Sequence, residues 1–291
     1  MMWFDPAITD LLRNLLPGLD NFFFWVSQLG GEVFYIAALL ILYWAVNKRE
    51  GILVSYILLF SVITNFWLKI AIAKDRPPSS NWHVNADPPN YSTPSGHSQN
   101  AATLYGWFTY RVRKLWMALI AIVLTLLVGI SRIYIGVHYL EDVLLGWGIG
   151  IATVLVFAYL EKPMSQFFSR YRTEHLWLVL MALGFVLTLI AAVIPQPPND
   201  NFGAYGGLTI GFALGLILEK RFVNFSTESH DGKKWRLVAR VVIGLAFVIL
   251  VMASLFLILP NQEIWLRTLR YCLIALTGVF LWPLIFTKAK L

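Results

Sequence analysis

Long apolar stretches, each about as long as a bilayer is thick, alternate along this chain with short polar connections. A helix needs about 20 mostly apolar residues to cross the hydrocarbon core of a membrane. The stretches are continuous rather than alternating, which favours helices over the strands of a membrane barrel. We therefore predict an all-α, polytopic transmembrane helix bundle of about nine spans, at residues 24–46, 51–73, 94–112, 115–134, 138–160, 176–195, 204–220, 237–259 and 264–286.

The first 20 residues follow a different pattern. Asp5 and Pro6 are typical of a helix start, and apolar residues then recur every three or four positions from Ile8 to Leu15. This spacing predicts an amphipathic helix lying on the membrane surface. An ordinary amphipathic cap on the helix bundle would show the same pattern.

The charge distribution predicts how the chain is oriented. Only 13% of the residues are charged, about half the share found in soluble domains. Most of the 23 lysines and arginines fall after spans 1, 3, 5 and 7 or in the C-terminal tail. Because cytoplasmic loops are enriched in these residues, we expect an outside N-terminus and a cytosolic C-terminus. The net charge of +7 follows from this topology, and no nucleic-acid partner is indicated.

Seven of the basic residues lie outside this pattern, and three of them are the informative ones: Lys69 near the outer end of span 2, Arg76 just beyond it, and Arg132 at the outer end of span 4. Each one alone could snorkel to the interface. Spans 3 and 5 begin on the same side, however, so the alternation of spans brings further polar residues to this face. Ionisable groups at membrane depth mark functional sites by default. The sequence therefore predicts one site built from the three cations together with Ser95, Gly96, His97, His138 and Asp142.

The beginning of span 3 is suited to hold an anion. Pro94 is a residue type that opens helices, and the first N–H groups of a helix are unpaired and favour negative charge. Gly96 has no side chain to block close approach, and Ser95 adds a hydroxyl donor. We expect a phosphate oxygen to bind here.

The spacing of His138 and Asp142, four residues apart, places both on one face of a helix. A carboxylate hydrogen-bonded to one imidazole nitrogen orients the ring and stabilises its cation when the other nitrogen attacks. His97, on another helix, could act as a general acid. The alternatives are a helix-end pair for the first two residues and an interfacial histidine for His97.

These residues resemble the signature of the type 2 phosphatidic acid phosphatase (PAP2) superfamily. All three parts of that signature occur in order: Lys69-x6-Arg76-Pro77, Pro94-Ser95-Gly96-His97 and Ser131-Arg132-x5-His138-x3-Asp142. The resemblance implies a PAP2/haloperoxidase-like helical core of five spans over residues 21–160, after the surface helix at 1–20. Residues 161–291 would then form a C-terminal transmembrane extension of about four spans. The nine-span layout resembles the glucose-6-phosphatase and sphingosine-phosphate phosphatase branches.

The resemblance also implies a role for each residue of the signature. His138 is similar to the nucleophile that forms a phosphohistidine, Asp142 would orient it, and His97 would protonate the leaving group. The phosphate oxygens would be bound by Lys69, Arg76, Ser95, Gly96 and Arg132. No metal and no cofactor is implied, because the cations and the helix N-terminus supply the charge stabilisation.

Further polar residues lie at similar depth and could support the site. Counted at about 1.5 Å per residue from the inner boundary, Glu32 and Asn65 fall slightly deeper than the signature. We expect Glu32 to be buried in the bundle, opposite a basic residue; a helix-end polar contact is the alternative. Gln99 and Asn100, one turn into span 3, could line the cavity floor together with Asn65.

The leading interpretation is a metal-independent phosphatase that removes a terminal phosphate, as monoester or pyrophosphate, from a membrane lipid. Candidate substrates are polyprenyl (di)phosphate, phosphatidate and phosphatidylglycerophosphate. Alternatives are a phosphotransferase using the same phosphohistidine, a sphingoid- or sugar-phosphate phosphatase, a vanadate haloperoxidase, and a transporter or lipid-binding protein. We expect a prokaryotic cell membrane with the site facing outward, or the lumenal face of the endoplasmic reticulum in a eukaryote. The sequence carries no signal of an oligomeric state.

Overall fold

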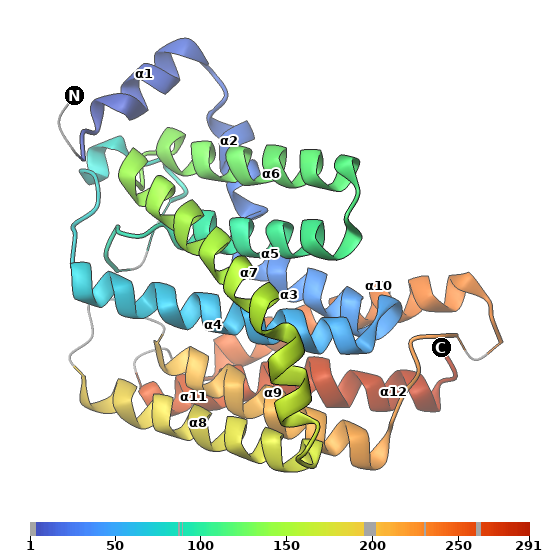
Figure 1. Cartoon of the computed structure of the whole chain (residues 1–291). Helices are drawn as coiled ribbons and strands as arrows, with labels where there is room; N and C mark the ends of the chain where they lie inside the picture. The colour runs from blue at the N-terminus through green and yellow to red at the C-terminus, as the bar shows by residue number, and fades with distance from the viewer. Residues whose placement is uncertain (1–3, 87, 89, 195–201, 230, 260–262) are drawn as a thin grey trace. The chain divides into compact units, whose positions relative to one another are not determined.

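The computed structural model describes all residues except 1–3, 87, 89, 195–201, 230 and 260–262, and the side chain of Phe202. The described part is helical and contains no strand (Figure 1). Its helices are α1 (Ala7–Leu15), α2 (Asp20–Gln28), α3 (Glu32–Ile41), α4 (Lys48–Ile72), α5 (Gly96–Val112), α6 (Leu115–Tyr134), α7 (Leu140–Phe168), α8 (Thr173–Val193), α9 (Phe202–Phe222), α10 (Lys234–Ile258), α11 (Ile264–Leu276) and α12 (Trp282–Lys288). Short π segments follow α3 and α11, at η1 (Leu42–Val46) and η3 (Thr277–Leu281), and a 3₁₀ turn forms η2 (Ser79–Asn81).

The predicted helix bundle is confirmed, but the count of nine spans is not. In the described part of the chain, six helices are long and apolar enough to cross a membrane: α4, α6, α7, α8, α10 and the run Ile264–Lys288. The bent pair formed by α2 and the segment Glu32–Val46 adds a seventh if it counts as one span. Helices α5 and α9 lie where spans were predicted, yet neither is among these six or seven. The chain is therefore a multi-pass integral membrane protein.

The chain divides into two compact units. Of the described residues, the first unit holds 4–36 and 54–161, and the second holds 37–53, 162–194 and those from 202 onward. The division at Glu161 lies next to the predicted end of the five-span core, whereas residues 37–53 belong to the second unit. Helix α1, expected at the membrane surface, is part of the first unit.

In the first unit, α5 and α6 run side by side, and α1 and α2 pack against α6 (Figure 1). Helix α1 is held by side chains as well as by its apolar stripe. Thr9 Oγ1 donates a hydrogen bond to the Ile133 carbonyl at 2.9 Å, and Arg13 donates to the carbonyls of Tyr134 and Asn81. Helix α1 therefore ties the end of α6 to the loop before α5.

Two glycines let α7 approach the beginning of α5 closely. A Cβ atom on Gly146 would lie 2.7 Å from the Ser95 carbonyl oxygen, and one on Gly150 would lie 2.4 Å from that of Gln99. Any larger residue would force the two backbones apart. The close crossing is what sets the first turn of α7 beside the first turn of α5.

The second unit is packed around α9, which contacts both α8 and α11. Here too glycines set the spacing. A Cβ atom on Gly207 would meet the Thr268 carbonyl oxygen at 2.1 Å, and one on Gly211 would meet that of Cys272 at 2.2 Å. Small residues at helix interfaces allow the dispersion contacts that hold membrane helices together, so this unit is a tightly packed helical layer.

Candidate active site

The carboxylate of Asp142 and the imidazole of His138 form a buried pair at the start of α7. His138 lies in the turn between α6 and α7, and Asp142 lies in the first turn of α7. The side chains are 2% and 0% exposed, and His138 Nδ1 is 3.1 Å from Asp142 Oδ2. The backbone N–H of Tyr139 donates to the same oxygen at 2.8 Å. The structure thus brings together the pair that the spacing predicted.

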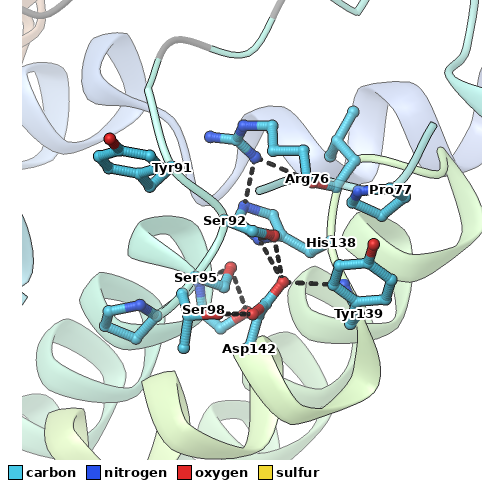
Figure 2. Close-up of polar contacts among 12 residues, drawn as sticks. Arg76, Pro77, Tyr91, Ser92, Ser95, Ser98, His138, Tyr139 and Asp142 are labelled. Carbon is cyan, nitrogen blue, oxygen red and sulfur yellow. Dashed lines mark hydrogen bonds and ion pairs between the residues drawn. The ribbon is translucent and has the colours of Figure 1, made fainter. Parts of the chain in front are cut away.

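Two hydroxyl groups that sequence reasoning missed complete the surroundings of Asp142 (Figure 2). Ser92 Oγ donates to Oδ2 and lies 3.3 Å from His138 Nδ1. Thr93 Oγ1 donates to Oδ1. Both carboxylate oxygens are therefore engaged as acceptors, and the carboxylate is fixed in the plane that receives the His138 N–H. These two residues directly precede the Pro94–His97 motif, but isolated hydroxyl residues carry no distinguishing sequence signal.

The position of Arg76 settles which nitrogen of His138 carries the proton. Arg76 Nη1 lies 3.1 Å from His138 Nε2, and a guanidinium can only donate hydrogen bonds. Nε2 is therefore the acceptor, and the proton resides on Nδ1, facing Asp142. Burial, and then the positive charge of Arg76, hold the pKa of His138 well below its ordinary value. At neutral pH the ring is thus neutral, and its Nε2 lone pair faces the Arg76 guanidinium.

Lys69 and Arg76 bind the loop that leads into α5. Lys69 Nζ donates to the carbonyls of Tyr91 and Ser92. Arg76 Nε donates to the Asn90 carbonyl at 2.9 Å, and Nη1 donates to the Val137 carbonyl at 2.9 Å. Burial lowers the pKa of Arg76 to about 10, so the guanidinium stays charged at neutral pH.

Arg132, at the end of α6, is 8% exposed. Its Nη1 donates to the hydroxyl of Ser27 on α2. Its Nε is buried and has no hydrogen-bond partner among the described residues. The positive charges of Lys69 and Arg132 both act on His138, as does that of Arg76, so all three predicted cations influence the imidazole.

The first turn of α5 is also part of the site around His138. Ser95 is the N-cap residue, and its hydroxyl accepts hydrogen bonds from the Ser98 backbone N–H and hydroxyl. The helix begins at Gly96, so Pro94 precedes the cap instead of opening the helix as predicted. The reason is that the Ser95 N–H donates a hydrogen bond outside the helix, to the backbone carbonyl of Asp142 at 2.9 Å. His97 lies close enough to Arg132 and His138 to interact electrostatically with both.

A buried amide network between α4 and α5 supports this turn. Asn65 Nδ2 donates to the Pro94 carbonyl at 3.2 Å and to Gln99 Oε1 at 2.9 Å. Gln99 Nε2 donates to the Ser61 carbonyl, and the Ser61 hydroxyl donates to Asn100 Oδ1. The three predicted amide residues, Asn65, Gln99 and Asn100, thus link α4 to α5 by hydrogen bonds. Asn65 also holds the backbone just before Ser95.

Comparison with known proteins identifies the family. The profile described as "PAP2 superfamily" matches residues 50–166, which include the whole of the site above. A second profile, "PAP2 superfamily phosphatase, transmembrane extension", matches residues 203–291. The chain belongs to the PAP2 superfamily. It is accordingly a phosphatase, a hydrolase of phosphoric esters.

Individual relatives are less than 30% identical to this chain. Phosphatidylglycerophosphatase B of Bacillus subtilis is 29% identical over 58% of this chain and 87% of that protein. Lipid phosphate phosphatase delta of Arabidopsis thaliana is 24% identical over 84% of this chain, which spans 64% of that protein. An undecaprenyl-diphosphatase of Sulfolobus acidocaldarius is 28% identical over 47% of this chain and 68% of that protein. The crystal structure of a PAP2 type phosphatidylglycerolphosphate phosphatase from Bacillus subtilis superposes with a TM-score of 0.48 at 27% identity, covering 54% of this chain and 84% of that one.

Two polar residues of this PAP2 phosphatase lie outside the site. Glu32 was expected to lie opposite a basic residue, but it stands at the first position of α3 and forms no ion pair among the described residues. Depth along the span sets the height of Glu32 but not the neighbour that its side chain meets. His83 stacks on Phe24 at 4.9 Å and anchors the loop before α5.

Within the described part of the chain, no three His, Cys, Asp or Glu side chains come together to hold a metal ion. Ser131, the remaining polar residue of the signature, donates to the Val128 carbonyl of its own helix.

Proposed function

We propose that this PAP2 phosphatase removes a terminal phosphate from a membrane lipid through a phosphohistidine on His138. The orientation of that imidazole carries the proposal: Nδ1 lies 3.1 Å from Asp142, and Nε2 lies 3.1 Å from Arg76 Nη1. A phosphate oxygen bound by Arg76 would bring its phosphorus opposite the Nε2 lone pair. The Arg76 guanidinium would then both place the phosphate near Nε2 and compensate its negative charge.

In the first step, the Nε2 lone pair of His138 attacks phosphorus, and the bond from phosphorus to the leaving oxygen breaks. The electron pair of that bond moves to the leaving oxygen, which takes a proton from His97. Asp142 stabilises the positive charge that develops on the His138 ring. The remaining phosphate oxygens are held by the charged and polar groups around the ring: Lys69, Arg76, Arg132, Ser95 and the amide of Gly96.

In the second step, water attacks the phosphohistidine while His97, now neutral, accepts a proton from that water. The phosphorus–nitrogen bond breaks, its electron pair returns to Nε2 of His138, and inorganic phosphate leaves. An alcohol in the place of water would give phosphotransfer by the same route. Neither step uses a metal ion, because the cations of the chain supply the positive charge.

A lipid is the substrate that suits the place of the site in the chain. Lys69, Ser95, Arg132 and Asp142 come from the ends of α4 and α6 and the beginnings of α5 and α7, with long apolar helices leading away from each. A phosphate head group would reach this polar end while its tail stays in the bilayer. The relatives named above act on phosphatidylglycerophosphate, on lipid phosphates and on undecaprenyl diphosphate, which supports this class of substrate.

One assay tests this proposal. Purified protein is offered polyprenyl mono- and diphosphate, phosphatidate, phosphatidylglycerophosphate and a sphingoid phosphate in excess chelator, beside His138→Ala. We expect phosphate release from at least one lipid in chelator and none in the variant. Unchanged release in His138→Ala would exclude this residue as the nucleophile. Phosphorylated product with an added alcohol acceptor would show transferase activity.

We further propose that the site opens on the outer face of the membrane, as the distribution of basic residues predicts. Val84, in the loop before α5, is 90% exposed, and Lys114 is exposed in the turn between α5 and α6. In a Cys272→Ser background, a cysteine at position 84 should react with a membrane-impermeant maleimide in right-side-out vesicles. A cysteine at position 114 should react only after permeabilisation. The reverse pattern would contradict this orientation.

A further inference from the structure

The break between α2 and α3 lies directly against the site. Helix α2 and the segment beginning at α3 meet at an angle of 45°, and the three residues between them form tight turns. The N–H of Gly30 donates to the Ser27 carbonyl, and the N–H of Gly31 donates to that of Gln28. A glycine pair at this point is a recognised cause of such a kink. Nothing in the reaction described above uses this segment.

The end of α2 contacts Arg132 through Ser27. Arg132 Nη1 donates to the hydroxyl of Ser27, a side chain that is 0% exposed. A guanidinium binds phosphate best through two parallel N–H groups. With Nη1 held by Ser27, the edge formed by Nε and Nη2 is left to bind a ligand. The buried Nε, which has no hydrogen-bond partner among the described residues, lies on that edge.

The chemical nature of this contact matters as much as its geometry. A serine hydroxyl carries no charge, and no carboxylate in the described part of the chain forms an ion pair with Arg132. The contact therefore fixes the direction of the guanidinium without neutralising it. An acidic residue at position 27 would fix the side chain equally well, but it would cancel the charge that attracts an anion.

The break between α2 and α3 also lies against α5, the helix that carries His97. A Cβ atom on Gly30 would lie 3.1 Å from His97 Cβ and 3.3 Å from His97 Cδ2, and it would clash with Val128 at 2.5 Å. The backbone of Gly30 therefore lies against the imidazole that is expected to donate the proton. By contrast, a Cβ atom on Gly31 would meet only Gln28, at 3.1 Å and beyond.

We propose that the broken α2–α3 segment is a positioning element for the active site. Ser27 aims the free edge of Arg132 at the substrate phosphate, and the bare backbone of Gly30 sets the place of His97. The segment thus acts on two separate events, binding of the phosphate and protonation of the leaving group. This inference rests on the proposed function, and the tests below separate the two.

The Ser27 contact is tested with vanadate, which mimics the phosphate during transfer. The inhibition constant of vanadate is measured for Ser27→Ala, Ser27→Thr and Ser27→Asp, with Thr153→Val as control. Thr153 is a buried residue whose hydroxyl bonds, among the described residues, only to the Ile149 carbonyl of its own helix. We expect vanadate to bind roughly tenfold more weakly in the alanine variant, still more weakly in the aspartate variant, and nearly as in the wild type when threonine restores the hydroxyl.

The Gly30 contact is tested by varying the leaving group. An alkyl phosphate needs a proton as the bond to its oxygen breaks, whereas p-nitrophenolate leaves without one. For Gly30→Ala we expect kcat/KM for a lipid phosphate to fall at least about tenfold more than kcat/KM for p-nitrophenyl phosphate, as in His97→Ala. Gly31→Ala, the same change one residue away, should keep the wild-type ratio.

The outcomes separate this inference from the proposed function. If the wild type releases no phosphate from any lipid, the proposed function fails. If the wild type is active but Ser27→Asp binds vanadate as tightly as the wild type, the neutral contact has no role in positioning. Equal losses for both leaving groups in Gly30→Ala would likewise overturn the role of Gly30. Size-exclusion profiles of the variants, compared with Thr153→Val, show that each one folds.

Discussion

Two buried arginines, one in each unit, show how the same residue type serves different purposes. In the second unit, all four terminal N–H groups of Arg240 donate to backbone carbonyls: those of Trp44, Ser226, Glu228 and Leu291. Its guanidinium also stacks on the ring of Phe286 at 4.3 Å. In the first unit, Arg132 makes one hydrogen bond within the described part of the chain, to Ser27. The chain uses every terminal N–H group of Arg240 and leaves only its Nε without a partner among the described residues. Arg132 keeps both Nη2 and Nε for a ligand.

The same contrast holds for the buried acids. Glu219, in the second unit, receives Lys48 at 2.7 Å and the N–H of Phe225 at 3.0 Å, so that it joins α4 to the end of α9. Asp142, in the first unit, also has its oxygens occupied, but one donor is a histidine whose second nitrogen is turned toward a cation. A buried charged residue is therefore a catalytic candidate when its contacts leave a reactive atom facing other charges. When every contact is used to join parts of the chain, its role is structural.

The largest effect is expected at Asp142. In Asp142→Asn the side chain keeps its shape, but its amide nitrogen donates where the carboxylate accepted, so the His138 tautomer is no longer fixed. A change of this kind behind a catalytic histidine costs on the order of 10³ to 10⁴ in kcat. Phosphate release by the purified variant measures it. A loss of less than about tenfold would mean that Asp142, like Glu219, serves only structure.

The pair Arg240→Gln and Arg132→Gln tests the comparison directly. Arg240→Gln leaves buried carbonyls without donors, and we expect the free energy of unfolding to fall by about 3 kcal/mol or more. Vanadate affinity of the folded fraction should stay unchanged. Arg132→Gln should show the opposite pattern. We expect its vanadate affinity to fall at least tenfold and its free energy of unfolding to fall by less than that of Arg240→Gln. Denaturant titration in detergent and vanadate inhibition measure the two effects. A loss of vanadate affinity in Arg240→Gln would erase the distinction.

A pH titration sharpens the account of His138. An ordinary imidazole is half protonated near pH 6.5, whereas burial and Arg76 lower the pKa of His138. Protonation of His138 should therefore begin only as the pH falls well below that value, and the reactive neutral form should persist in mild acid. The nitrogen chemical shifts of ¹⁵N-labelled histidine, assigned with His138→Ala, report this. A midpoint at or above pH 6.5 would show that Asp142 outweighs burial.

The smallest effect is expected in the amide network. Asn65→Ala removes two hydrogen bonds that hold the backbone before Ser95, without removing any group that touches substrate. Because a neutral hydrogen bond contributes about 1 kcal/mol, we expect kcat/KM to fall less than about tenfold. Val54→Ala, at an apolar site of the same helix, serves as control for a simple loss of packing. A thousandfold loss would place Asn65 in the binding site itself.

Much of this site could be predicted from the sequence because it depends on topology. Successive spans reverse direction, so the ends of α4 and α6 and the beginnings of α5 and α7 must meet on one side of the membrane. That rule predicts that Lys69, Arg132 and Asp142 lie on the same face. The spacing of His138 and Asp142 also predicted the right pair, although His138 lies in the turn before α7 and not on the helix face that was expected.

The remaining features depend on contacts that spacing does not encode. Ser92 and Ser27 are functional candidates only because their hydroxyls meet Asp142 and Arg132, and a serine in a polar loop or a helix carries no such signal. The expectation that Glu32 faces a basic residue was wrong because depth along a helix does not determine which neighbour a side chain meets. The glycine pair at 30 and 31 was present in the sequence, but glycines are common in membrane helices and do not reveal where a helix will bend.

The most direct test of the central claim is to trap the phosphorylated enzyme. Protein is mixed with a ³²P-labelled lipid phosphate, quenched in alkali within milliseconds, and digested for mass spectrometry. We predict an alkali-stable, acid-labile label on the peptide that contains His138, absent in His138→Ala and still formed, then lost more slowly, in His97→Ala with a substrate whose leaving group needs no proton. Label on another residue, or rapid turnover of the wild type without any trapped label, would contradict the phosphohistidine.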